Sequence, residues 1–230
     1  EAGVKPDYIA VLENVPTGTA LVFPEKEGSD RFLLPENVAY DQTALPEHPL
    51  PAFDGIVFGS LASFRSESVK NAVSALAKAN PKAEKLFDVN LRLSFFNKPL
   101  LEELLGLCTI CKVNDEEASK VGSILFGKEM EYPEFAERIL STYPSCHVVL
   151  VTKGSNGAAA YVRDKGAYIV PGEKITVCDT VGAGDAFAAA FLALWLATSD
   201  AEKALKAGNA AGAYTASKPG AFPSYDHAFV

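Results

Sequence analysis

Hydrophobic and polar residues follow two different patterns along the chain, and the change comes near residue 51. Before it, three short β-like runs at 8–12, 18–23 and 31–34 are separated by turn-forming residues. After it, short apolar runs alternate with longer segments in which apolar residues recur every three or four positions. The sequence therefore predicts a small β unit with connecting segments over 1–50 and an α/β domain over 51–230.

The second pattern predicts a mostly parallel sheet. The expected strands are 55–59, 85–89, 109–113 and 147–152, followed by a hairpin of 157–162 and 167–171. The expected helices are 66–79, 99–107, one beginning at 115, 133–143, 182–197 and 201–217. Repeated strand–helix units give a sheet with helices on both faces, which is a three-layer α/β/α sandwich. Ligands of such sheets bind at the carboxyl ends of the strands, and we expect the site there.

Composition narrows the choice of partners. The chain has 230 residues and a formal net charge of −8, and it shows no basic footprint for nucleic acid or anionic lipid. The longest apolar run, 186–197, is too short to span a bilayer, and the polar start of the chain does not resemble a signal peptide. We therefore expect a cytoplasmic protein that binds neither nucleic acid nor membrane.

The four cysteines are expected to be free thiols, most of them in the core. Cys108-Thr-Ile-Cys111 has the spacing of a redox or zinc pair. The segment lies in a predicted strand, however, where positions three apart face opposite sides of the sheet. The sequence contains no second pair of this kind, so a metal or redox site is not favoured.

The clearest chemical signal is Asp179-Thr-Val-Gly-Ala-Gly-Asp185, which runs directly into an apolar helical segment. The first turn of a helix offers unpaired N–H groups and the positive end of the helix dipole, so this turn is suited to bind an anion. Asp185 falls in that turn and can accept a proton there. The structural alternative is a plain helix start. Phe187 occupies the third glycine position of Gly-x-Gly-x-x-Gly, which disfavours a dehydrogenase.

This segment resembles the signature of the ribokinase-like (PfkB) carbohydrate kinases. The resemblance implies a ribokinase-like fold, with 1–50 as a β lid and 51–230 as the nucleotide-binding and catalytic domain. It also implies ATP and Mg²⁺ as cofactors. Matched residue by residue, it makes Asp185 the catalytic base at the substrate hydroxyl. Gly182, Ala183 and Gly184 would form the anion hole.

Two further segments are similar to nucleotide-binding elements of that family. Asn114-Asp-Glu-Glu117 matches the Asn-x-x-Glu element near the metal and the ATP phosphates, which implies an indirect role for Glu117 at Mg²⁺. An acidic helix start is its structural alternative. Val151-Thr-Lys-Gly-Ser-Asn-Gly157 is similar to the family's Thr-x-Gly-x-x-Gly segment, which makes Thr152 and Gly154 candidate ATP contacts. Asn209 matches a position that borders the adenine.

Two positions concern the sugar and a monovalent ion. Asp88-Val-Asn-Leu-Arg92 resembles a stretch of fructokinase-like members, from which we take Arg92 as a substrate contact. A surface ion pair is the alternative for Arg92. Asp179, with the Val181 carbonyl, matches a family position that can hold K⁺.

The resemblance covers nearly all of the chain, but the family's first strand and early sugar-binding residues have no counterpart here. We expect the chain to be part of a longer polypeptide. Family members often pair through their lid strands, so a homodimer is expected.

The predicted function is an ATP-dependent sugar kinase, with fructose as the first substrate. The alternatives are 2-keto-3-deoxygluconate, ribose or fructose phosphates as substrates, and, more distantly, a nucleoside. A homologue that binds sugar or nucleotide without catalysis is the alternative from another class.

Overall fold

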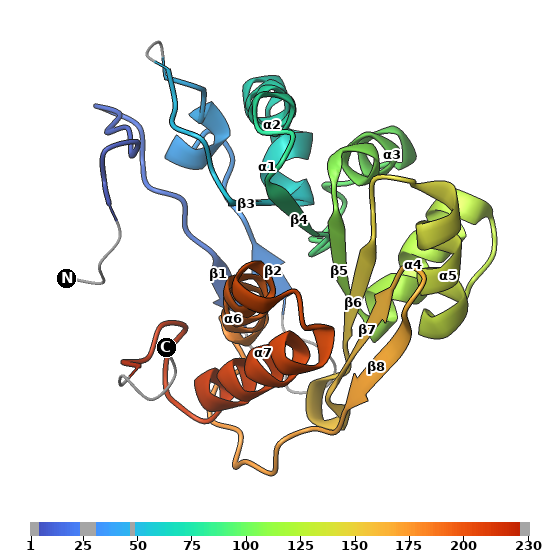
Figure 1. The fold of residues 1–230 in the computed structure, drawn as a ribbon. Helices are drawn as coiled ribbons and strands as arrows, with labels where there is room; N and C mark the ends of the chain where they lie inside the picture. Colours follow the sequence, from blue (N-terminus) through green and yellow to red (C-terminus); the bar gives the residue numbers. More distant parts are fainter. Residues whose placement is uncertain (1–4, 24–30, 47–48, 226–230) are drawn as a thin grey trace.

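The computed structural model describes residues 5–23, 31–46 and 49–225 (Figure 1). Within these ranges the chain forms a two-stranded sheet, a six-stranded sheet and seven α-helices. The turn-forming residues expected between the runs 18–23 and 31–34 lie outside the described residues. None of the helices in the described ranges is long and apolar enough to cross a membrane.

The six-stranded sheet has its strands in sequence order. They are β3 (Gly55–Gly59), β4 (Glu84–Asp88), β5 (Ile110–Asn114), β6 (Val148–Thr152), β7 (Ala158–Val162) and β8 (Gly166–Val170). Strands β3 to β6 are parallel to one another, and β7 and β8 add an antiparallel hairpin. Every predicted strand after residue 51 is confirmed, with ends that differ by about one residue.

The helices connect and cover these strands. They are α1 (Ser60–Arg65), α2 (Glu67–Ala79), α3 (Lys98–Leu107), α4 (Asp115–Phe126), α5 (Tyr132–Thr142), α6 (Ala183–Thr198) and α7 (Ala201–Ala216). Ser66 caps the start of α2, since its side chain accepts the Val69 N–H. Helix α1 was not predicted, because its six residues are too few to display a helical period.

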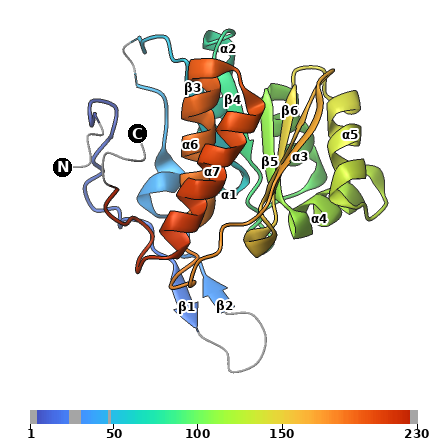
Figure 2. The ribbon, with the colours of Figure 1, turned by 60° about the horizontal axis from the view of Figure 1, so that its bottom comes forward.

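Two apolar cores lie on opposite faces of the sheet. Along β6, Val148 and Leu150 face the core made with α6 and α7, whereas Val149 and Val151 face the core made with α3, α4 and α5. Figures 1 and 2 show the two groups of helices on either side of the strands. The predicted three-layer sandwich is therefore confirmed, and burial on both faces explains why these strands are apolar throughout.

The cysteines differ in one respect from the expectation. Cys108 is the C-terminal cap of α3 and does not lie in a strand, so it shares one core cluster with Cys111 and Cys146. All three are fully buried free thiols, while Cys178 is exposed. Burial raises the pKa of Cys111, which keeps this thiol protonated and unreactive.

The β unit at the start of the chain is smaller than predicted. Strands β1 (Leu21–Phe23) and β2 (Arg31–Leu33) form an antiparallel hairpin that projects from the sandwich (Figure 2). The strand predicted at 8–12 is wrong: the segment makes a turn, in which Ile9 N–H donates to the Pro6 carbonyl, and Val11 is 89% exposed. A β-like run forms a strand only where a neighbouring strand accepts its hydrogen bonds.

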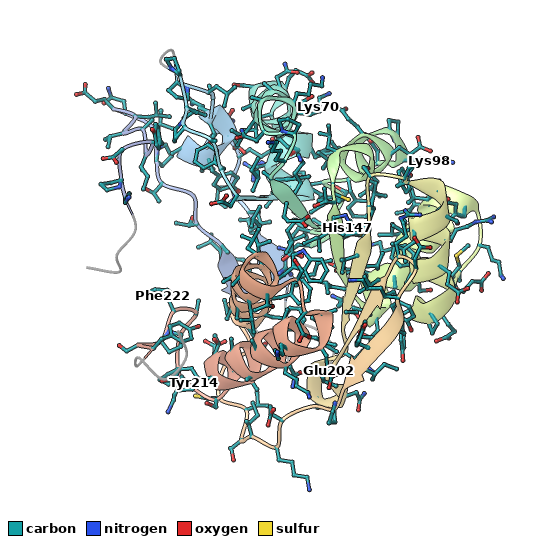
Figure 3. The ribbon with its side chains drawn as sticks, viewed as in Figure 1. Lys70, Lys98, His147, Glu202, Tyr214 and Phe222 are labelled. Carbon is teal, nitrogen blue, oxygen red and sulfur yellow. The ribbon has the colours of Figure 1, made fainter. Side chains whose placement is uncertain are left out.

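A polar network closes the amino end of the sheet. The Glu84 carboxylate accepts hydrogen bonds from Trp195 Nε1 at 2.9 Å and from the Thr109 hydroxyl, and it pairs with His147 Nε2 at 3.2 Å. His147, labelled in Figure 3, also stacks on the Trp195 ring of α6. Burial raises the pKa of Glu84, but the hydrogen bonds outweigh it and lower the pKa to about 2.

We predict that this network makes stability depend on acid pH. The carboxylate has a lower pKa in the folded state, so its contribution is present above pH 4.5 and is lost as the pH falls toward 2. Glu84→Gln should lower the free energy of unfolding at pH 7 by about 1–3 kcal/mol and flatten its decline in acid. Urea unfolding across that range measures both effects. The control Glu202→Gln removes an exposed pair with Lys206 and should cost under about 0.5 kcal/mol. Parallel pH profiles for Glu84→Gln and the unaltered chain would contradict the prediction.

Candidate active site

The parallel strands bring polar residues together at one edge of the sheet. Gly59 of β3 lies opposite Asp88 of β4, and Asn114 of β5 lies opposite Thr152 of β6. All four are the last residues of their strands. This is the edge at which a ligand was expected, and the turn into α6 lies against it.

The turn before α6 has a backbone that requires glycine. Gly182 is the N-terminal cap of α6 with φ of 80°, and an added Cβ would lie 2.2 Å from the Ala221 carbonyl oxygen. Asp179 Oδ1 accepts the Val181 N–H at 2.9 Å, which fixes the preceding residues. Glycine is thus required at position 182 both by the positive φ and by the contact with Ala221 in the C-terminal segment.

The backbone N–H groups at the start of α6 differ in whether they have a hydrogen-bond acceptor. Ala183 N–H donates to the Thr180 carbonyl at 3.2 Å. No carbonyl of the described residues accepts the N–H of Gly184 or Asp185, which is typical of a helix start. Two unpaired amides and the positive end of the dipole therefore meet at Gly184, and the Asp185 carboxylate is exposed beside them.

A cavity of about 280 Å³ lies next to this turn. Its walls include the predicted nucleotide contacts Thr152, Gly154 and Asn209 together with Ala183 and Gly184 of the predicted anion hole. Apolar side chains complete it, namely Ile175, Val177 and Phe187. A mostly apolar wall with a few polar groups is suited to a ligand that combines a flat heterocycle with a charged group, with the charged group at the helix start.

Two polar side chains of this region already have partners within the protein. Lys153 lies over the Tyr132 ring, 5.3 Å from its centroid, so its ammonium is directed toward α5. Asn209 Nδ2 donates to the Pro171 carbonyl at 3.1 Å and holds α7 against the segment after β8.

Asn114 and Glu117 form a capping box at the start of α4. Asn114 Oδ1 accepts the Glu117 N–H at 2.7 Å, and Glu117 Oε2 accepts the Asn114 N–H at 3.0 Å. Glu117 Oε1 also accepts the Leu91 N–H at 2.8 Å, which ties the loop after β4 to α4. Burial raises the pKa of Glu117, although these backbone hydrogen bonds act in the opposite direction. The motif thus has a structural role in addition to any role at a ligand.

The side chains at this edge of the sheet offer few ligands for the expected Mg²⁺. Within the described ranges, no group of three or more His, Cys, Asp or Glu side chains is arranged to hold a metal ion. Mg²⁺ that enters with a nucleotide needs few protein ligands, because water and phosphate oxygens complete its shell. A single carboxylate such as Glu117, acting through water, fits that requirement.

A buried ion pair joins two strands below the turn. Lys112 Nζ of β5 lies 2.8 Å from Asp88 Oδ2 of β4, with the side chains 7% and 13% exposed. An added Cβ on Gly184 would lie 3.5 Å from the same ammonium. Lys112 was missed in the sequence, and only Arg92, not Asp88, was predicted as a site residue from the segment that contains both. The signal was present in Ile110-Cys-Lys-Val113, where one charged residue interrupts an otherwise apolar strand.

Arg92 lies at the border of this group. The side chain is exposed and makes no hydrogen bond or ion pair with a described residue, and its charge is close enough to lower the pKa of Asp88. Burial is the larger effect on Asp88 and raises its pKa overall. Two residues of the same loop, Asn90 and Leu93, have positive φ values of 39° and 51°. Such backbone strain is concentrated at functional sites.

Comparison with known proteins gives consistent matches. The family model for pfkB family carbohydrate kinases matches residues 1–228. An ATP-dependent ribose-1-phosphate kinase of Halopiger xanaduensis is 40% identical over 121 residues, which cover 52% of this chain and 36% of that protein. The Arabidopsis thaliana protein named "Probable fructokinase-6, chloroplastic" is 32% identical over 228 residues, which cover 90% of this chain and 57% of that protein. The chain therefore spans about a third and somewhat over half of these two relatives.

A solved structure supports the same grouping. An uncharacterized sugar kinase from Pyrococcus horikoshii in complex with ATP matches with a TM-score of 0.72 and 27% identity, over 91% of this chain and 67% of that chain. The E. coli protein named "putative Ribokinase II" matches with a TM-score of 0.75 and 22% identity, over 92% of this chain and 68% of that chain. The two matches confirm the ribokinase-like fold expected from the sequence.

We predict that the turn before α6 tolerates no side chain at Gly182. Gly182→Ala should lower the free energy of unfolding by about 1–3 kcal/mol, because alanine is strained at this φ and its Cβ would overlap the Ala221 carbonyl. Gly106→Ala is the control: the residue lies inside α3, an added Cβ would meet no other part of the described structure within 4 Å, and the change should stabilise by about 0.5–1 kcal/mol. Urea unfolding gives both values. Equal effects of the two substitutions would contradict the account of the turn.

Proposed function

Because the chain belongs to the pfkB family of carbohydrate kinases, we propose that the complete protein transfers the γ-phosphoryl group of ATP to a carbohydrate hydroxyl. The observation that carries the proposal is the position of Gly184. This residue lines the cavity and also lies beside Lys112 and next to Asp185. A phosphate chain that leaves the cavity therefore meets the unpaired amides and a base within one helical turn.

The proposed arrangement of ATP follows from the walls of the cavity. The adenine would lie among the apolar side chains and near Asn209, and Thr152 and Gly154 would contact the nucleotide. The terminal phosphate would approach the start of α6, where Gly182, Ala183 and Gly184 supply backbone amides. The Ala183 amide already donates to Thr180, so Gly184 is the more available donor.

The transfer step is an in-line displacement at the γ-phosphorus. The sugar oxygen forms a bond to phosphorus as the bond to the β–γ bridging oxygen breaks, and ADP leaves with that electron pair. Asp185 accepts the hydroxyl proton, so the attacking oxygen gains nucleophilic character as the new bond forms. The amides at the helix start stabilise the charge on the phosphoryl oxygens.

Two cations belong to the proposal. Mg²⁺, held through water by Glu117 close to Asn114, would neutralise phosphate charge. A K⁺ ion near Asp179 remains a prediction. The Asp179 carboxylate already accepts the Val181 N–H through Oδ1, which leaves its other oxygen for a cation.

Fructose is the first proposed sugar. The support is the Asp88-Val-Asn-Leu-Arg92 segment and the likeness to a fructokinase-named plant protein along 90% of the chain. Arg92, exposed on the strained loop, would contact a sugar or phosphate oxygen. Ribose 1-phosphate is the second candidate, because the kinase of that substrate shares 40% identity over 121 residues.

A substrate panel separates these candidates. ADP release by the complete protein would be measured with fructose, ribose, ribose 1-phosphate, fructose phosphates, 2-keto-3-deoxygluconate and a nucleoside. Preference for fructose supports the first proposal, and preference for ribose 1-phosphate replaces it with the second. Sugar binding without ADP release on any member would favour a non-catalytic homologue.

The lid hairpin supports a proposal on assembly. Leu21 and Leu33 lie opposite one another across the hairpin and are 45% and 50% exposed. Apolar side chains on a projecting hairpin are suited to pair with a second copy. We propose a homodimer through the lid, in a cytoplasmic protein. Sedimentation that shows only monomer at micromolar concentration would overturn it.

We predict that Asp185→Asn lowers kcat by about 10²–10⁴-fold, because the amide cannot accept the hydroxyl proton. ATP affinity should be largely unchanged, since the cavity does not include this side chain. Asp200→Asn is the matched control: it changes the N-cap of α7, where Asn caps as well as Asp, and kcat should be retained. Steady-state turnover and ATP titration measure the two effects. Normal turnover in Asp185→Asn would overturn the proposed base.

A further inference from the structure

Lys112 is a buried cation whose donors are only partly used. The residue is 6% exposed in the middle of the sheet, and an ammonium carries three N–H donors. Asp88 Oδ2 accepts one of them at 2.8 Å, and no other described residue accepts a hydrogen bond from Nζ. Two donors of a desolvated charge therefore remain without an acceptor among the described residues. A buried ammonium retains so few partners only at a considerable cost in free energy.

The second observation is the position of this ammonium beside the start of α6. An added Cβ on Gly184 would be 3.5 Å from Lys112 Nζ, so nothing separates the charge from the first turn of the helix. The start of a helix carries partial positive charge and stabilises anions, whereas a cation is favoured at the opposite end. The dipole at the start of α6 disfavours a cation there, and the described carboxylate that pairs with Lys112 is that of Asp88. A phosphate placed beside Gly184 would be attracted both by the helix start and by the ammonium, and it would accept the unused donors.

We infer that Lys112 contacts the transferred phosphoryl group, as a second electrostatic donor opposite the Gly184 amide, and that Asp88 is a positioning residue that holds the ammonium there. The inference rests on the proposed kinase function and adds a residue to its site. A charge-assisted N–H···O contact is stronger than a neutral one, and at the reacting phosphoryl group it acts mainly on the transition state.

Burial alone does not indicate that a lysine contacts a phosphate, as a second buried lysine shows. Lys85 is also 6% exposed and lies one strand away in β4. Its Nζ donates to the Ala83 carbonyl at 2.8 Å and approaches the Pro81 carbonyl at 3.4 Å, at the amino end of the sheet. Backbone oxygens thus satisfy Lys85 at the end of the sheet opposite the first turn of α6. The two residues form a matched pair for experiment.

The test compares Lys112→Met with Lys85→Met in the complete protein, using the preferred sugar of the unaltered protein. Lys112→Met should lower kcat by about 10²–10³-fold, the usual effect of removing one transition-state donor, with little change in the KM for ATP. Lys85→Met should keep kcat. A fall in Lys112→Met that appears only in the KM for ATP, or no fall at all, overturns the inference.

A binding measurement separates this inference from the function itself. ADP with fluoroaluminate mimics the transferring phosphoryl group and should bind about 100-fold more tightly than ADP alone to the unaltered protein. Lys112→Met should lose most of that enhancement and Lys85→Met should retain it, whether or not any sugar is phosphorylated. Failure of every sugar with this pattern intact would sink the proposed function and spare the phosphate contact. An absent enhancement in the unaltered protein overturns the inference.

A further variant guards against misfolding. Lys112→Met leaves Asp88 buried without a partner, whereas the double variant Lys112→Met/Asp88→Asn removes both charges and is expected to fold better. The double variant should also lose the fluoroaluminate enhancement. If it folds and keeps the enhancement, the ion pair is structural only and the inference is wrong.

Discussion

The close approach of α6 and α7 is the contact on which the site depends. Gly208 and Gly212 of α7 face α6, and added Cβ atoms would lie 3.0 Å from the Phe187 carbonyl oxygen and 3.1 Å from the Ala183 carbonyl oxygen. Glycine at these positions lets the two backbones approach without side chains between them. The first turn of α6 is thereby fixed against α7 while its aromatic residues pack on the sheet. A small rotation of α6 would displace Gly184 and Asp185 from the strand ends. The proposed phosphoryl transfer therefore depends on the packing of α6 against α7, away from the candidate site itself.

Most of the fold could be predicted from the sequence, because apolar residues are spaced differently in strands and in helices. Buried strands such as 147–152 are continuous apolar runs, and the helices carry caps and stripes that mark their ends. The errors arose where local pattern is insufficient. The segment 8–12 has a β-like composition but no neighbouring strand, and Cys108 was assigned to a strand although it caps α3. Both depend on tertiary neighbours, which periodicity does not report.

The site was predictable in its motifs and less so in its contacts. The residues 152, 154, 183, 184 and 209 come from three separate segments, and the structure places them around one cavity. The pairing of Asp88 with Lys112 could not be foreseen, because it follows from the register of β4 and β5. The capping box shows a second limit. The Asn114-x-x-Glu117 pattern fits both a helix cap and the proposed role near the metal, and only the geometry reveals that the carboxylate already accepts two backbone amides.

The charges around Gly184 also determine what kind of anion the site can accept. Three carboxylates gather there, those of Asp88, Glu117 and Asp185, against the two cations Lys112 and Arg92. Burial raises the pKa of Asp88 and of Glu117, which shows that this environment already disfavours negative charge. A nucleotide triphosphate adds several more negative charges. The helix dipole and one ammonium offset only part of them, so we expect the phosphates to enter together with a divalent cation. The charge balance therefore supports the proposed divalent cation, although few of the described side chains are available to ligate one.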